Sequence, residues 1–307
     1  MKKIFVCLCL SFVYTVSSWA QSKKIVGYFP SWKSNLVQTF DYKKVTHLNF
    51  SFLSLYADGS LRPFEKTFEL DEVVKKAHAK GVKVLISVGG WDLGDGGGVD
   101  DAFELMASRK KSRTKFVNQM MKFVDNYQLD GVDIDWEFPS DEAGMAGFDS
   151  LARDLKNAFQ PKGKLVTVAI TPEDYYGKFI AFSSFQYFDF LNVMIYDGGN
   201  PHANYDYFVQ AFEYWKKRGM PADKIVLGVP FYGMKNGTQM GYNEIISSDP
   251  KSIEKEVYNE LEFNNQATIK KKSQFAHQNA GGIMIWELSQ DAEAPYSLLD
   301  AIWEGMK

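Results

Sequence analysis

Cysteine is almost absent from this sequence. Its 307 residues contain only two, Cys7 and Cys9, and both fall in an apolar run that follows two N-terminal lysines. Residues 1–20 join this basic start and apolar run to a small-residue end at Ala20, the order typical of a secretory signal peptide. We expect cleavage after Ala20 and a secreted or periplasmic chain without disulfides, whose hydrophobic core alone has to stabilise the fold.

Long apolar runs, charge blocks and low-complexity segments are absent after residue 20. No later stretch approaches the roughly 20 apolar residues that span a membrane. The formal net charge at pH 7 is only −3, which gives no reason to expect nucleic acid or a membrane surface as a partner. Because no Pro/Ser/Thr-rich linker interrupts residues 21–307, we expect them to form one domain.

Two catalytic classes lack the residues that they need. The sequence has no G-x-S-x-G motif of the serine hydrolases. Its four histidines, His47, His78, His202 and His277, show no metal-ligand spacing. The glycine-rich stretch at 92–101 lacks the alternating Asp and Asn ligands of a calcium loop. We therefore expect no metal and no cofactor.

Short apolar runs rich in β-branched residues recur after the first 20 residues, and segments with helical spacing lie between many of them. Strands that alternate with helices pair in parallel, so eight such units predict an α/β fold, the (β/α)8 TIM barrel, with its active site at the C-terminal ends of the strands. A doubly wound open sheet is the alternative, disfavoured because no glycine-rich phosphate fingerprint follows the first strand. The predicted strands are 24–29, 45–52, 82–88, 131–137, 164–170, 190–196, 224–230 and 281–287, and the clearest helical segments are 70–80, 113–128, 148–159 and 207–219.

The stretch LDGVDIDWEFP holds four carboxylates among apolar residues: Asp130, Asp133, Asp135 and Glu137. Side chains alternate across a strand, so the last three share a face, which we expect to point into the barrel with Glu137 at the C-terminal rim. Consecutive acids about 6.6 Å apart along the strand repel by about 2.5 kcal/mol at an effective dielectric of 20. At least one should therefore hold a proton near neutral pH, as a general acid requires.

Two other interpretations of these carboxylates compete with catalysis. Clustered carboxylates suit hard cations, but three acids along one strand form a line and no cage. Asp133, the deepest of the three, also suits a buried structural network. Trp136, on the opposite face of the strand, is expected to pack against the helices.

At these residues the sequence resembles glycoside hydrolase family 18, the chitinases and their relatives. The family signature D-G-x-D-x-D-x-E is matched at every fixed position, from Asp130 to Glu137. Further stretches match in the family's order along almost all of residues 21–307. These are GYFPSW (27–32), THLNFSF (46–52), SVGGW (87–91), MIYD (194–197) and GGIMIWE (281–287).

The resemblance implies substrate-assisted hydrolysis with retained configuration, an exception to the usual pair of opposed carboxylates. Glu137 would protonate the glycosidic oxygen while the 2-acetamido carbonyl of the sugar attacks the anomeric carbon. Asp135 would hold the acetamido N–H and Tyr196 its carbonyl oxygen, and Asp133 would hold Asp135. Acids on one strand face approach the bond from the same side, which is consistent with a nucleophile supplied by the substrate.

The resemblance also implies a set of residues that line the sugar subsite. Trp286 is expected to form an apolar floor, and Trp91 a neighbouring stacking platform. Phe50 and Met194 could equally be ordinary core residues. The full substrate-binding set is Tyr28, Phe50, Gly90, Trp91, Met194, Asp197 and Trp286.

The sequence departs from the family at three places. Phe138 stands where a tyrosine usually follows the acid, and Asn192 where a glutamine is frequent. The segment 233–280 is too short to hold both a barrel helix and the additional α+β module that walls the cleft of many chitinases. We therefore expect a barrel without this insertion module and a shallow, open cleft.

Together these observations predict a secreted, monomeric, endo-acting hydrolase of β-1,4-linked N-acetylglucosamine polymers, chitin or chitooligosaccharides, formed by residues 21–307. An endo-β-N-acetylglucosaminidase acting on glycoprotein N-glycans shares the chemistry and stays open as an alternative. A non-catalytic chitin-binding lectin is the alternative of another class, disfavoured because Glu137 is present.

Overall fold

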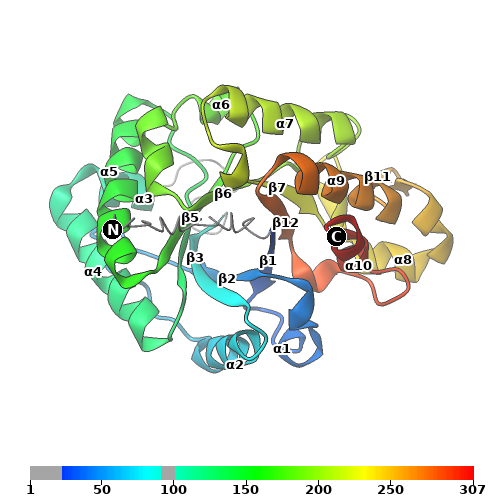
Figure 1. Ribbon diagram of the computed structural model, residues 1–307, viewed down its shortest axis with the longest axis horizontal. Helices are drawn as coiled ribbons and strands as arrows, with labels where there is room; N and C mark the ends of the chain where they lie inside the picture. The colour runs from blue at the N-terminus through cyan, green and yellow to red at the C-terminus, as the bar shows by residue number, and fades with distance from the viewer. Residues whose placement is uncertain (1–22, 91–100) are drawn as a thin grey trace, which may run out of the picture.

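The computed structural model describes residues 23–90 and 101–307. In them, eight parallel strands close into a barrel in the order β1-β12-β7-β6-β5-β4-β3-β2, and helices surround it (Figure 1). The predicted (β/α)8 barrel is confirmed, and every predicted strand is present. The barrel strands are β1 (Lys24–Pro30), β2 (His47–Leu53), β3 (Lys83–Gly89), β4 (Gly131–Asp135), β5 (Leu165–Ile170), β6 (Phe190–Val193), β7 (Ile225–Pro230) and β12 (Gly282–Trp286).

Four of the surrounding helices begin at polar residues that accept hydrogen bonds from their first turns. Asp141, Asn204, Asn265 and Ser297 cap α5, α7, α9 and α10 in this way, which satisfies backbone N–H groups that have no partner inside the helix. The helices are α1 (Leu36–Thr39), α2 (Thr67–His78), α3 (Asp101–Ser108), α4 (Lys110–Asn126), α5 (Glu142–Phe159), α6 (Asp174–Gly177), α7 (Tyr205–Lys217), α8 (Tyr242–Ser248), α9 (Gln266–Asn279) and α10 (Leu298–Gly305).

The hydrophobic core has an outer and an inner part. The outer part lies between the strands and the helices, where Trp136 stacks on Phe103 of α3 at 5.3 Å between ring centroids and lies 5.9 Å from Phe148 of α5. The prediction that Trp136 packs outward is confirmed. The small inner part fills the barrel below the polar site, and its buried members are Val26, Tyr28, Phe190, Val226 and Met284.

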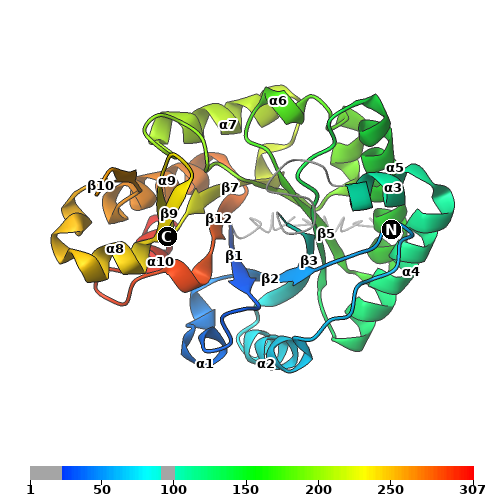
Figure 2. The ribbon, with the colours of Figure 1, turned by 180° about the vertical axis from the view of Figure 1, so that it is seen from behind.

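The segment between β7 and β12 is short, yet it holds more structure than the sequence predicts. It contains an antiparallel sheet in the order β10-β11-β8-β9 together with α8, ahead of the barrel helix α9. Figure 2 shows β9, β10 and α8 grouped outside the barrel, next to β7 and β12. The expectation of a barrel without such a module is therefore corrected in one respect, because a small α+β element is present. Its strands are β8 (Tyr232–Lys235), β9 (Thr238–Gly241), β10 (Val257–Tyr258) and β11 (Leu261–Glu262).

The sequence predicts a cleaved signal peptide and no membrane-spanning segment. The predicted signal peptide, residues 1–20, lies outside the described residues. Among residues 23–90 and 101–307, no helix is both long enough and apolar enough to cross a membrane.

Candidate active site

Strand β4 carries its carboxylates into the barrel. The exposed fraction is 0% for Asp133 and 2% for Asp135, while Val132 and Ile134 on the other face join the outer core. The strand ends at Asp135, so Glu137, half-buried, lies two residues beyond it and not within the strand as predicted. The three acids thus rise from the barrel interior to its C-terminal rim, where TIM-barrel enzymes place their catalytic groups.

Asp133 is surrounded by hydrogen-bond donors from four other strands. Oδ2 accepts from the Tyr28 hydroxyl at 2.7 Å and from Ser87 Oγ at 3.0 Å, and Oδ1 accepts from Thr167 Oγ1 and, at 3.1 Å, from Asn192 Nδ2. Burial raises the pKa of the Asp133 carboxyl, and the four donors oppose that rise by stabilising the ionised form. Asp133 is therefore fixed in orientation, and its pKa lies above the ordinary value for an aspartate.

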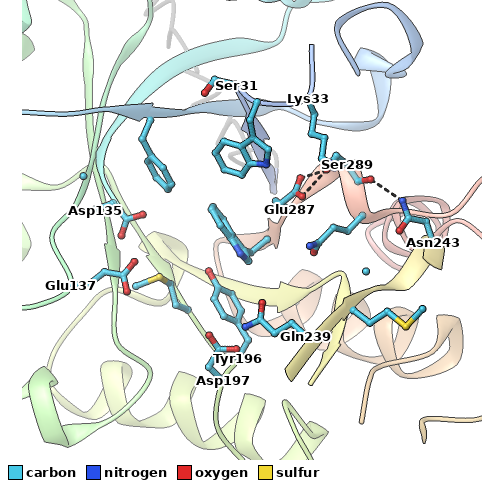
Figure 3. A pocket seen from close by; sticks show the side chains of 18 of the residues that line it. Ser31, Lys33, Asp135, Glu137, Tyr196, Asp197, Gln239, Asn243, Glu287 and Ser289 are labelled. Carbon is cyan, nitrogen blue, oxygen red and sulfur yellow. Dashed lines mark hydrogen bonds between the residues drawn. The ribbon is translucent and has the colours of Figure 1, made fainter. Parts of the chain in front are cut away.

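A cavity of about 960 Å³ opens above these strands. Figure 3 shows Asp135 and Glu137 on one side of it and Tyr196 and Asp197 on another, all directed into the same space. Of the residues that the sequence assigns to the site, those that line the cavity are Asp135, Glu137, Met194, Tyr196, Asp197 and Trp286.

Tyr196 and Asp197 lie just beyond the end of β6. Burial raises the pKa of the Tyr196 hydroxyl well above its ordinary value, and the negative charges of Asp135 and Glu137 raise it further, so Tyr196 keeps its proton and can donate it in a hydrogen bond. Asp197 has a φ of 57°, a left-handed conformation that aspartate adopts more readily than most residues. Its carboxylate accepts a hydrogen bond from the hydroxyl of Tyr232 on β8.

Aromatic rings form one wall of the cavity. Trp286 at the end of β12 stacks with Phe52 at 5.8 Å between centroids, and Phe52 lies 6.4 Å from Trp32. Tyr28, inside the barrel, supports Trp286 edge-on at 5.4 Å. Large flat rings beside hydrogen-bonding groups suit a ligand with both apolar and polar faces, as a sugar has.

A family model for the glycosyl hydrolases family 18 matches residues 24–291. The chain belongs to this family.

The family 18 chain is similar to several chitinases. Probable chitinase 2 of Drosophila melanogaster is 25% identical over 362 residues, which cover 90% of this chain and 71% of the relative. Probable chitinase 10 of the same organism is 26% identical over 265 residues, which cover 74% of this chain but 11% of that much longer protein. The crystal structure of the GH18 chitinase ChiB from the chitin utilization locus of Flavobacterium johnsoniae has a TM-score of 0.83 and 29% identity, with 94% of each chain covered.

Phe50 does not line the cavity. Its side chain is buried in the outer core, stacked on Phe29 at 5.9 Å between centroids, and the assignment of Phe50 to substrate binding is corrected to Phe52, which lines the cavity. The cause is a register shift between Ser51 and Leu53 in the pairing of β2 with β3. Such a bulge turns the following side chain to the other face of the sheet.

Of the remaining predicted substrate-binding residues, two lie near the cavity and one lies outside the described residues. Tyr28 does not line the cavity but contacts Asp133 and Trp286 from inside the barrel. Gly90 has a φ of +79°, and a Cβ there would lie 2.5 Å from the Phe52 ring, so glycine leaves room for that ring. Trp91 lies outside the described residues.

The sequence did not point to several other residues that line the cavity. Glu287 directly follows Trp286, and its carboxylate accepts hydrogen bonds from Ser289 N and Oγ, both at 2.7 Å; burial raises its pKa. Asn243 of α8 donates to the Ser289 carbonyl at 3.0 Å (Figure 3). Glu287 could have been predicted from the sequence, because it directly follows a barrel strand, where TIM barrels place site residues. The remaining cavity residues that were missed include Trp32, Lys33, Phe52, Gln239, Met240 and Glu244.

The positions of the His, Cys, Asp and Glu side chains show whether they could bind a metal ion. Within the described ranges, no group of three or more His, Cys, Asp or Glu side chains is placed to hold a metal ion. Asp133 of β4 instead accepts hydrogen bonds from hydroxyl and amide donors.

Proposed function

We propose that the protein is a secreted, retaining, endo-acting hydrolase of β-1,4-linked N-acetylglucosamine in chitin or chitooligosaccharides, and that it uses substrate-assisted catalysis. The observation that carries the proposal is the convergence of Asp135, Glu137 and Tyr196 on one cavity walled by Trp286. The chitinase names of its relatives support the choice of substrate.

The first step breaks the glycosidic bond. Glu137 gives its proton to the glycosidic oxygen, and the bond's electron pair leaves with that oxygen. The acetamido carbonyl oxygen of the same sugar attacks the anomeric carbon and forms a cyclic oxazolinium ion. Asp135 accepts a hydrogen bond from the acetamido N–H and balances the positive charge. The Tyr196 hydroxyl donates a hydrogen bond to the carbonyl oxygen and orients it.

The second step restores the acid. Ionised Glu137 takes a proton from water, the hydroxide oxygen bonds to the anomeric carbon, and the ring opens to return the acetamido group. Two displacements at one carbon retain its configuration. Asp133, held by four donors, keeps Asp135 aligned.

The first prediction tests whether Glu137 is the acid. Glu137→Gln keeps the shape of the side chain but has no proton to give, and loss of general acid catalysis lowers kcat by about 100- to 10,000-fold. The measurement is hydrolysis of N-acetylglucosamine hexamer by mass spectrometry, with the first-formed anomer identified by NMR as β. Glu213→Gln, an exposed acid of α7, is the control and should keep wild-type activity.

Four outcomes contradict parts of this proposal. A Glu137→Gln variant with more than a tenth of wild-type activity would assign the acid elsewhere. A first-formed α anomer would exclude the substrate-assisted route. Binding of the hexamer without hydrolysis by the wild type would favour the lectin alternative, and cleavage confined to a high-mannose glycopeptide would favour the endo-β-N-acetylglucosaminidase.

A further inference from the structure

A row of aromatic rings leads away from Glu137 at the C-terminal rim of the barrel. Phe138 directly follows the acid, its ring centroid lies 5.4 Å from that of Tyr176, and the Tyr176 centroid lies 4.7 Å from that of Tyr175. Exposure increases along the row, because Phe138 and Tyr176 are half-buried whereas Tyr175 is 69% exposed. We name Phe138, Tyr176 and Tyr175 the aromatic ledge.

Hydrogen bonds from α7 hold the segment that carries two rings of the ledge. Tyr175 and Tyr176 belong to α6, which lies beside α7 in both views (Figures 1 and 2). From α7, the Tyr214 hydroxyl donates to Asp174 Oδ1 at 3.1 Å. Arg218, at the end of α7, donates to backbone carbonyls at both ends of the turn that follows α6. A ring held in place before binding loses little conformational freedom when a ligand stacks on it.

The ledge lies on the side of the barrel opposite Trp286. It stands at the ends of β4 and β5, and in the closed strand order these two strands lie across the barrel from β12 and β1. Trp286 ends β12, and Trp32 lies just past β1. A sugar chain that passes Trp32, places its reacting unit at Trp286 and its scissile bond at Glu137 therefore continues toward the ledge.

We propose that the aromatic ledge binds N-acetylglucosamine units on the reducing-end side of the cleaved bond. This inference rests on the proposed function and adds the residues that hold the leaving part of the substrate. The C–H faces of a pyranose ring are apolar, and tyrosine offers a broad, rigid face together with a hydroxyl that can stay in water. Tyr175, the outermost and most exposed ring, would meet the sugar farthest from the cleaved bond.

The second prediction compares two substrates on Tyr175→Ala. One is N-acetylglucosamine hexamer labelled with ¹⁸O at its reducing end, and the other is 4-nitrophenyl di-N-acetylchitobioside, whose leaving group is too short to reach Tyr175. The variant should lose about 3- to 10-fold in kcat/KM on the hexamer, the worth of one aromatic stacking contact, and stay within about twofold on the nitrophenyl substrate. Its cuts of the hexamer should shift toward the labelled end, because fewer sugars are held beyond Glu137.

Two further variants make the test specific. Phe182→Ala removes a ring that is equally exposed, at 68%, but contacts Gly219 at the opposite end of the barrel, and it should behave as wild type. Tyr175→Trp keeps an aromatic face and should restore the hexamer rate and cutting pattern. If Tyr175→Ala leaves the cutting pattern and the hexamer rate unchanged, the proposed role of the aromatic ledge is wrong but the proposed function stands. If the wild type cleaves neither substrate, both proposals are wrong.

Discussion

At the scale of single residues, two aspartates of one short motif have different surroundings. Asp133 lies at the centre of the barrel with four donors around it. Asp130 lies at the other end of β4, where Oδ2 accepts from Val84 N and pairs with His78 Nε2, both at 2.8 Å. An aspartate therefore supports the proposed catalytic geometry in one place and strand pairing in the other.

The third prediction follows from this contrast. In Asp133→Asn an amide NH₂ would face hydroxyl or amide donors, and leaving buried donors without an acceptor costs about 1–3 kcal/mol. We expect a lower urea midpoint. We also expect a kcat about tenfold lower, because Asp135 is no longer held in place and a tenfold loss corresponds to about 1.4 kcal/mol of transition-state stabilisation. Asp130→Asn is the matched control and should keep kcat. Equal kcat values in the two variants would show that Asp133 has no role in positioning Asp135.

At the scale of elements, the small sheet beside the barrel braces the loop after β6. Glu262 of β11 accepts from His202 N at 2.7 Å and from Lys235 Nζ at 2.6 Å, and the Glu262 carbonyl accepts from His202 Nδ1 at 3.2 Å. The other ring nitrogen of His202 accepts from Asp197 N at 3.2 Å. The sheet thus reaches the proposed substrate contact Asp197 through His202, and directly through Tyr232.

The fourth prediction tests this bracing. Glu262→Gln replaces a charged acceptor whose pKa is lowered by Lys235 and the His202 N–H, and hydrogen bonds to charged groups contribute about 1.5–3 kcal/mol. We expect kcat/KM on the hexamer to fall about tenfold. The control is Glu304→Gln, which removes the exposed pair between Lys270 and Glu304 at 2.8 Å and should change nothing, since exposed pairs contribute little. Equal values of kcat/KM in both variants would show that the small sheet does not position Asp197 for substrate binding.

At the scale of the whole molecule, a buried lysine ties the barrel helix α9 to the distant loop after β6. Lys272 of α9 is fully buried, and its Nζ donates to the carbonyl of Ala203, in the loop after β6, and to Asn264 Oδ1, just past β11. Burial lowers the pKa of Lys272 from 10.5 to about 7. In the unfolded chain the amine stays protonated until much higher pH, so folding releases a proton between these two values.

The fifth prediction is a dependence of stability on pH. The cost of burying the charge is greatest below pH 7 and disappears as the pH rises toward 10.5, so this residue makes the free energy of unfolding increase with pH across that window. Urea unfolding of the wild type and of Lys272→Met at pH 7.5 and 9.5 should show a smaller rise in the variant. Lys270→Met, an exposed position on the same helix, should rise in parallel with the wild type. Parallel curves for all three proteins would exclude Lys272 as the source.

The barrel and its catalytic strand were predictable because their signals are local. Strands that alternate with amphipathic helices leave a periodic pattern in the sequence, and each predicted barrel strand is present. The alternation of side chains along β4 likewise places Asp133 and Asp135 inside and Trp136 outside. The sheet β8–β11 was missed because strands of two to four residues are too short for a period to emerge.

By itself the sequence determined the family, the barrel and the line of acids that ends at Glu137, because each depends on residue types at a fixed spacing along one segment. Only the tertiary structure decided that Phe52 and not Phe50 faces the cavity, since the shift in β2 arises from its pairing with β3. The same holds for the four donors to Asp133 and for the brace from Glu262 to Asp197, because these contacts join residues from strands and loops far apart in the chain, and sequence spacing carries no information about which of them meet.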